Sequence, residues 1–334
     1  MPPKEMQQVN FSTAMPTAEQ AVVACIDQAD RATWILPHAF ALARALQAPL
    51  TLMHVLDPRP AYQGRPDPVE WDIRRHEARR RLGRLSGETG ESAAMGVELA
   101  EGAPAEQICG YAHANGDCPI VLGTRSQQNA SSTGLGGTAY NVLLGAAGPV
   151  LLVPKDAALA APAYHRILVP LDGSSWAESV LPMATVLAGA CDAELILVHV
   201  VPTPEFTEIR PLESEDLELR QRVIQRNEAT AHIYLERIRS KLASMPLRVR
   251  VISVRGEDVR SMLAMIIRDE QADLVVLSAN GRGSNRHAEL RFGSVSSYLM
   301  SHCTAPMLIV HPAGSQQQYP VATPTVRLPT GCLA

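Results

Sequence analysis

Glycine and serine residues with the spacing of a phosphate-binding loop lie in the last quarter of the chain. Ser278 and Gly281 follow a short apolar run, and Gly293 with Ser294 opens a predicted helix further on. Backbone N–H groups can point at anionic oxygens there, because glycine places no Cβ in the way and a helix N-terminus favours negative charge. Three arginines add positive charge to the same loop: Arg282, Arg286 and Arg291. The pattern favours a phosphate-bearing ligand, and the alternative is an ordinary flexible loop with Ser294 as the N-cap of its helix.

The chain repeats itself, and the repeat supplies the elements that must position this loop. Residues 21–56 align without a gap with residues 166–201, so that Asp27 falls on Asp172 and Pro37 on Pro182. Residues 149–153 align in the same way with residues 306–310. Self-similarity of this kind indicates one structural unit present twice.

Each copy alternates short apolar runs with helical patterns. Strands are predicted at residues 22–26, 50–56, 119–122 and 150–153, and again at 167–171, 194–201, 274–277 and 308–310. One further strand in each copy ends at Gly102 or Gly256. A long helix in the second copy is predicted from apolar residues three, four and seven apart, namely Leu217, Ile224, Ala231, Leu235, Ile238 and Leu242. The order βαβαβαβαβ predicts α/β domains in tandem, each a doubly wound, five-stranded parallel sheet.

The expected organisation is two domains with polar segments around them. We expect an N-terminal tail at residues 1–20, domains at 21–155 and 166–312, a linker at 156–165 and a disordered tail at 313–334. Ligands of open parallel sheets bind outside the carboxyl ends of the strands. Asp172 after the first strand and Ser278 after the fourth are therefore expected at one edge of the sheet.

Composition excludes several classes of function. The 334 residues carry 34 acidic and 30 basic side chains, a net charge of −4, so no overall field attracts nucleic acid or a membrane surface. Aromatic residues make up 4% of the chain, which weighs against stacking platforms for single-stranded nucleic acid. No apolar run is long enough to span a bilayer. The 6 cysteines never occur at C-x-x-C spacing, so we expect no metal site, and free thiols in a reducing, cytoplasmic environment.

The residues at these positions resemble a known family. The stretches ILVPLDGSSWAESVLPMA, LILVHVV and SANGRGSNRHAELRFGSVSSYLMSHCTAPMLIV of the second half are similar to a universal stress protein domain, and the first half resembles another. The resemblance covers nearly everything between Ala21 and Pro312. It implies Rossmann-like domains of the adenine nucleotide alpha hydrolase type that bind ATP, alone or with Mg²⁺. The family motif is glycine, two residues, glycine, nine residues, then Gly-Ser or Gly-Thr.

The second half keeps most of this motif. By resemblance, Asp172 and Val200 lie on the adenine and ribose side, and Gly281, Gly293 and Ser294 on the phosphate side. Ser278 stands where the first glycine is expected, and it still offers a backbone N–H and a hydroxyl. The segment between Gly281 and Gly293 is two residues longer than the family spacing, which we interpret as an outward bulge.

The first half keeps a weaker version. Its matching positions are Asp27, Val55, Gly123, Ser126, Gly136 and Thr138. Ser126 replaces the second glycine, and Gly137 separates Gly136 from Thr138. The loop at residues 127–135 has no basic residue, and Arg125 is the nearby cation. We therefore expect the better site in the second half.

Two further patterns have ordinary structural explanations. His54 and His199 occupy matching positions inside apolar strands and are interpreted as structural, hydrogen-bonded histidines. The basic residues between Arg74 and Arg84 are interpreted as a solvated helix face, with an acidic partner or nucleic acid as the alternative.

Taken together, the sequence predicts a tandem, ATP-binding stress-response protein. No general base is evident beside the phosphate loop, so slow ATP hydrolysis is the most that we expect. By resemblance to the family, whose domains pair through strand five, the fifth strands are expected to pair the two halves within the chain, and further self-association into a homodimer is the additional expectation. The alternative function is a stress scaffold or chaperone-like protein that binds no nucleotide.

Overall fold

A computed structural model describes residues 20–27, 32–58, 67–88, 95–124, 135–155, 157, 164–203, 214–281 and 292–311. Several predictions fall outside these ranges. They concern the two tails, most of the linker, and five side chains of the two motif loops: Arg125, Ser126, Arg282, Arg286 and Arg291.

The two halves contain the same succession of elements. The first half comprises β1 (Val22–Cys25), α1 (Ala32–Ala45), β2 (Leu50–Leu56), α2 (Pro68–Glu88), β3 (Gly96–Glu101), α3 (Pro104–Ala114), β4 (Ile120–Gly123), α4 (Gly137–Gly145) and β5 (Val150–Val153). The second half comprises β6 (Arg166–Pro170), α5 (Ser175–Glu178), α6 (Leu181–Cys191), β7 (Glu194–Pro202), α7 (Ser214–Leu242), β8 (Arg248–Gly256), α8 (Val259–Asp269), β9 (Leu274–Ser278), α9 (Ser294–His302) and β10 (Met307–Val310). The predicted strands are all present, and no predicted strand end differs from the observed one by more than one residue.

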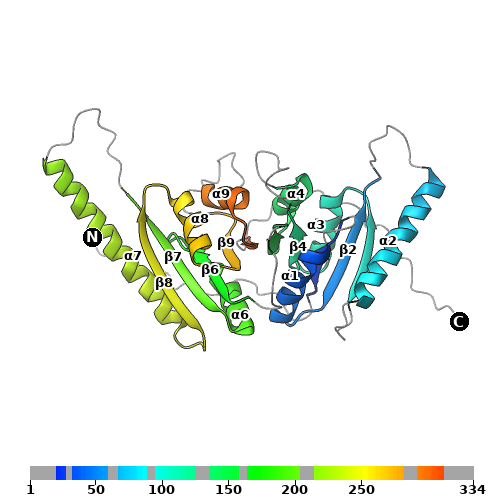
Figure 1. Cartoon of the computed structure of the whole chain (residues 1–334), viewed down its shortest axis with the longest axis horizontal. Coiled ribbons are helices and arrows are strands. Elements are labelled where there is room, and N and C mark those ends of the chain that lie inside the picture. The colour runs from blue at the N-terminus through cyan, green and yellow to red at the C-terminus, as the bar shows by residue number, and fades with distance from the viewer. Residues whose placement is uncertain are drawn as a thin grey trace.

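All ten strands belong to one sheet in the order β3-β2-β1-β4-β5-β10-β9-β6-β7-β8. Neighbouring strands are parallel within each half, and β5 pairs with β10 antiparallel, with Leu151 opposite Leu308. The predicted fold of two doubly wound sheets is confirmed, and the fifth strands join them as expected. The halves are therefore related by an approximate two-fold axis between β5 and β10 (Figure 1).

Helices cover both faces of the sheet, as the buried apolar runs require. One core lies beneath α1, α2, α6 and α7, and the other beneath α3, α4, α8 and α9. Along β4, Val121 faces the first core and Leu122 the second, because side chains of a strand alternate between faces. Within the described ranges, no helix has the length and apolar character needed to cross a bilayer.

The predicted long helix is present as α7, and its apolar stripe is buried along most of its length. Ile224, Ala231 and the last apolar residues of the predicted stripe are buried, but Leu217 is 51% exposed. The helix has 29 residues and is about 43 Å long, whereas β8 has 9 residues and spans about 30 Å. The first turns of α7 therefore project beyond the sheet that would cover them (Figure 1).

Candidate functional site

A cavity of about 220 Å³ opens at the carboxyl ends of β6, β7 and β9, beside the start of α9. Its lining contains all six positions expected from the sequence of the second half, namely Asp172, Val200, Ser278, Gly281, Gly293 and Ser294. These residues come from four separate parts of the chain. The volume is below the roughly 300–1,000 Å³ of pockets for drug-sized ligands, so the described residues can enclose only part of a ligand of that size.

The turn after β6 holds Asp172 in a defined orientation. Its Oδ1 accepts hydrogen bonds from the Ser174 backbone N–H at 2.9 Å and the Ser174 hydroxyl at 2.5 Å. Ser174 in turn caps α5, because its Oγ accepts from the Ala177 N–H at 3.1 Å. Gly173 between them has φ of +78°, a left-handed conformation that glycine adopts without strain. The turn thus presents one carboxylate at the rim of the cavity.

Gly281 approaches this carboxylate closely. A Cβ added at Gly281 would lie 3.0 Å from Asp172 Oδ2, and a Cβ at Gly293 would lie 3.4 Å from the Gly281 backbone nitrogen. The Gly293 N–H donates to the Ala279 carbonyl at 2.9 Å. The two glycine segments therefore pack backbone to backbone: a Cβ at Gly293 would just reach van der Waals contact with the Gly281 segment, and a Cβ at Gly281 would crowd the Asp172 carboxylate.

The start of α9 faces the same space. Gly293 is the N-cap, with φ −61° and ψ 153°, and Ser294 is the first helical residue. The alternative that Ser294 is the N-cap is wrong, because α9 begins at Ser294 itself, one residue earlier than that role requires. The buried Ser296 hydroxyl donates to the Ser278 carbonyl at 2.8 Å and so ties the first turn of α9 to the end of β9. First-turn N–H groups have no partner within a helix, so this end of α9 can receive an anion.

The rest of the lining is largely apolar. Val198 and Val200 project from β7, and Leu263, Leu277 and Phe292 close the wall on the side of α8 and α9. The sequence analysis did not identify Val198, although its spacing of two from Val200 places both on one face of a strand. It also did not identify Phe292, which precedes Gly293 directly.

The described residues that line the site include a single charged side chain. Asp172 is the one ionisable side chain in the described lining. No group of three potential metal ligands occurs in the described part of the chain. An anionic ligand would be held there by backbone N–H groups and the helix dipole.

The two matching histidines are structural, as predicted. The His54 Nδ1–H donates to the Ile26 carbonyl at 2.6 Å, and the His199 Nδ1–H donates to the Leu171 carbonyl at 2.7 Å. A carbonyl only accepts, which assigns the proton to Nδ1 in both rings. Each histidine thus fastens the second strand of its half to the residue after the first strand.

The first half repeats the scaffold of the site with a different lining. Gly136 is the N-cap of α4 with φ −68° and ψ 150°, nearly the values of Gly293. Met53 stands at the position of Val198, and Leu135 at that of Phe292; both are buried. The strand, turn and helix that would carry a site therefore occur twice. On the second strand of each half, however, the second half has the smaller side chain, Val198, where the first half has Met53.

Fold and site together define a class of protein: paired doubly wound α/β domains, with a ligand cavity at the carboxyl edge of the second sheet. The universal stress protein family model matches residues 20–154 and 163–311. The chain belongs to the universal stress protein family, with two such domains in tandem.

Individual relatives agree with this assignment. A universal stress protein from Mycolicibacterium smegmatis is 28% identical over 196 residues, which are 58% of this chain and 61% of that protein. A crystal structure of a universal stress protein from Archaeoglobus fulgidus has a TM-score of 0.61 at 16% identity, covering 92% of this chain and 100% of its own. A functionally unknown protein from Pseudomonas aeruginosa PAO1 has a TM-score of 0.56 at 17% identity, with 88% and 93% covered. At these identities, the two structures are evidence for the fold.

Proposed function

We propose that this protein binds an adenine nucleotide, with ATP as the expected ligand and the second half as the binding half. The observation that carries the proposal is the cavity that gathers Asp172, Val200, Ser278 and the two glycine segments at the N-terminus of α9. An apolar pocket between strand ends suits a base, and a glycine-capped helix N-terminus suits phosphate.

We assign the residues their roles from the family resemblance, and their shared place in the lining of the cavity supports this assignment. Asp172 and Val200 lie on the nucleoside side, with the Asp172 carboxylate held as an acceptor for ribose or base N–H and O–H groups. Gly281, Gly293 and Ser294 lie on the phosphate side. Larger side chains at either glycine would fill the space between the two loops, where a Cβ would already be within 3.4 Å of Gly281 N or Asp172 Oδ2.

We favour the second half as the binding half because Val198, a small side chain of β7, lines its cavity. Val198 leaves space beneath the ligand where the first half has the longer Met53. Asp27, Val55, Gly123, Gly136 and Thr138 would form the corresponding weaker site of the first half, while Ser126 lies outside the described residues.

We propose a binding protein rather than an enzyme. The ionisable group of the described lining, Asp172, is engaged by two donors from Ser174 in the turn that precedes α5. A group held in this way is suited to orient a ligand. The five cysteines among the described residues are free thiols, which supports placing the protein in a reducing compartment such as the cytoplasm.

The test is to denature purified protein, identify any released nucleotide by chromatography, and titrate nucleotide-free protein with ATP, AMP and adenosine with and without Mg²⁺. Gly293→Val is expected to abolish binding, because its side chain would press on the Gly281 backbone. Gly110→Val is the matched control, since a Cβ at Gly110 meets nothing within 4 Å. No released nucleotide, together with no thermal shift in millimolar Mg-ATP, would favour the scaffold function instead. Unchanged affinity in Gly293→Val would move the site to the first half.

A further inference from the structure

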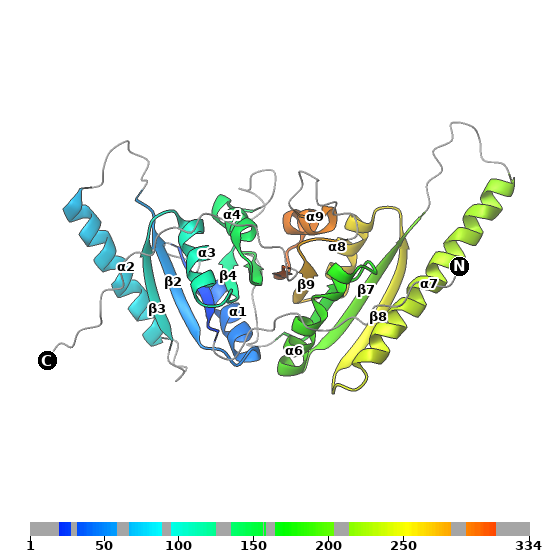
Figure 2. The same cartoon turned by 180° about the vertical axis from the view of Figure 1, so that it is seen from behind.

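The wall of the cavity in the second half touches the first half of the chain. The Phe292 ring, which is 7% exposed and lines the cavity, meets the Tyr140 ring of α4 edge to face, with centroids 6.1 Å apart and planes at 75°. Figure 1 and Figure 2 both show α4 and α9 facing each other across the middle of the molecule. An aromatic pair of this geometry contributes beyond the burial of its area.

The same helix is held by the second half at its other end. His311, directly after β10, lies with Nε2 3.0 Å from the Leu143 carbonyl of α4 and Nδ1 3.1 Å from the Gly148 carbonyl. Tyr140 and Leu143 are three residues apart on one side of the helix. Helix α4 thus contacts the second half at two positions about one turn apart, so the contacts at Leu143 restrain the helix that carries Tyr140.

The position of Phe292 matters because Gly293 follows it. Gly293 caps α9, donates its N–H to the Ala279 carbonyl, and lies against the backbone of Gly281. A displacement of the Phe292 backbone would move the adjoining cap of α9 relative to the Gly281 segment. The contact with Tyr140 therefore constrains the part of the cavity that would face the phosphates.

The duplicated fold offers no equal contact in the other direction. The counterpart of Tyr140 in α9 is Ser297, and the counterpart of Phe292 in the first half is Leu135. Serine and leucine cannot form a ring pair. The bracing is one-way: the first half supports the site of the second.

We infer that Tyr140 is a positioning residue for the nucleotide site of the opposite half, acting through Phe292 on Gly293. The inference rests on the proposed nucleotide binding for its ligand, but the bracing itself is a property of the protein without ligand. It assigns the first domain a role in completing the site of the second.

The test compares Tyr140→Ala with Tyr140→Phe in the full chain. In the ligand-free protein, hydrogen exchange of the Gly293 amide should accelerate in Tyr140→Ala and stay unchanged in Tyr140→Phe, which keeps the ring. In calorimetric titration with ATP, Tyr140→Ala should weaken binding roughly 2- to 10-fold, and Tyr140→Phe should restore it. Phe292→Leu should reproduce the effect of Tyr140→Ala, and the double variant should add nothing further.

The outcomes separate the two proposals. Unchanged Gly293 exchange in Tyr140→Ala overturns the bracing role, whatever ATP does. Faster exchange with an unchanged ATP affinity also overturns it. If the wild-type protein binds no nucleotide while Tyr140→Ala accelerates exchange at Gly293, the nucleotide proposal fails and the bracing between halves is supported.

Discussion

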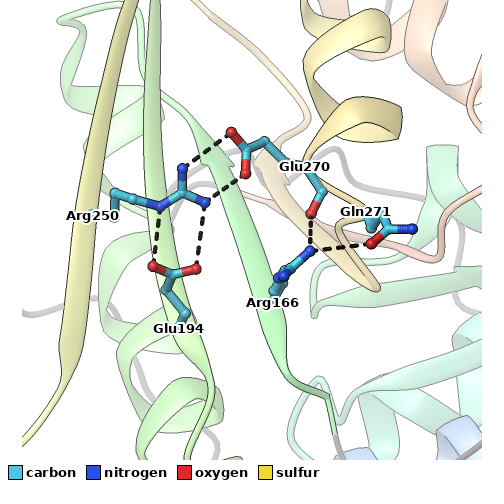
Figure 3. Close-up of polar contacts among 5 residues, drawn as sticks. All are labelled: Arg166, Glu194, Arg250, Glu270 and Gln271. Carbon is cyan, nitrogen blue, oxygen red and sulfur yellow. Dashed lines mark hydrogen bonds and ion pairs between the residues drawn. The ribbon is translucent and has the colours of Figure 1, made fainter.

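Replacing Arg250 by methionine should destabilise the second half at neutral pH. Arg250 on β8 lies between two carboxylates, Glu194 at the start of β7 and Glu270 at the C-cap of α8 (Figure 3). Its guanidinium donates to Glu194 at 3.0 and 3.4 Å and to Glu270 at 3.1 and 2.5 Å. Arg166 of β6 donates to the Glu270 carbonyl at 2.9 Å, which holds the second carboxylate in place.

The size of the effect follows from these contacts. Side-chain exposures are 40% for Arg250, 30% for Glu194 and 26% for Glu270, so solvent screens each pair in part. Hydrogen bonds to charged groups contribute about 1.5–3 kcal/mol, whereas exposed ion pairs contribute about 0–1 kcal/mol. For two bidentate, half-screened pairs we expect a loss of about 2 kcal/mol, because methionine also leaves the two carboxylates facing each other. Methionine keeps the aliphatic packing of the arginine stem.

The effect should depend on pH in a defined direction. Hydrogen bonding to Arg250 lowers the pKa of Glu270 from its ordinary value of 4.5. A lowered carboxyl pKa stabilises the folded state above that value, and the stabilisation is lost as the pH falls through the folded pKa. The difference between wild type and Arg250→Met should therefore be full at pH 7 and shrink as the pH falls below 4.5 and through the lowered pKa of folded Glu270.

Urea denaturation at both pH values measures this difference. The matched control is Arg248→Met, two residues earlier on the same face of β8. Arg248 is 66% exposed and lies 3.6 Å from an Asp192 carboxylate that is 96% exposed, so its replacement should change stability much less. Equal losses in the two variants, or a loss in Arg250→Met that is as large at pH 3.5 as at pH 7, would refute this reasoning.

Three other perturbations test the site and the interface between halves. Val198→Met should weaken ATP binding, measured by calorimetry, roughly tenfold or more, because the longer side chain enters a cavity of about 220 Å³. Unchanged affinity would show that the ligand does not lie against Val198. Ser296→Ala should lower the free energy of unfolding by about 1–2 kcal/mol in urea, since it leaves the buried Ser278 carbonyl without its donor; a change near zero would contradict that role. Burial lowers the pKa of His311 from its ordinary value of 6.5. Below about pH 6.5 the unfolded chain therefore binds a proton at His311 more readily than the folded chain does, and this proton uptake favours unfolding. Stability should consequently fall between pH 7 and 5.5, and His311→Gln should flatten this dependence; an unchanged slope would assign it to other groups.

Much of the site could be predicted because it follows strand ends. Asp172 and Ser278 come directly after buried apolar runs, and parallel strands bring their carboxyl ends to one edge. Val198 and Phe292 were missed because nothing in an apolar residue distinguishes a cavity wall from a filled core. Leu217 belongs to the apolar stripe that predicts α7 but lies outside the core, because helical spacing shows which side of a helix is apolar, whereas the length of the neighbouring strand decides which turns are covered.

The sequence by itself determined that the chain is one α/β unit present twice, because periodicity, turns and glycine positions are local properties that survive in the linear order. It also determined which residues follow each strand, and hence the family and the composition of the loops. Tertiary structure alone decided which residues of distant segments contact one another. The antiparallel pairing of β5 with β10 brings Tyr140 against Phe292, and the fold of the second half places Arg250 between Glu194 and Glu270. These contacts join residues far apart in the chain, and packing in three dimensions is what selects them.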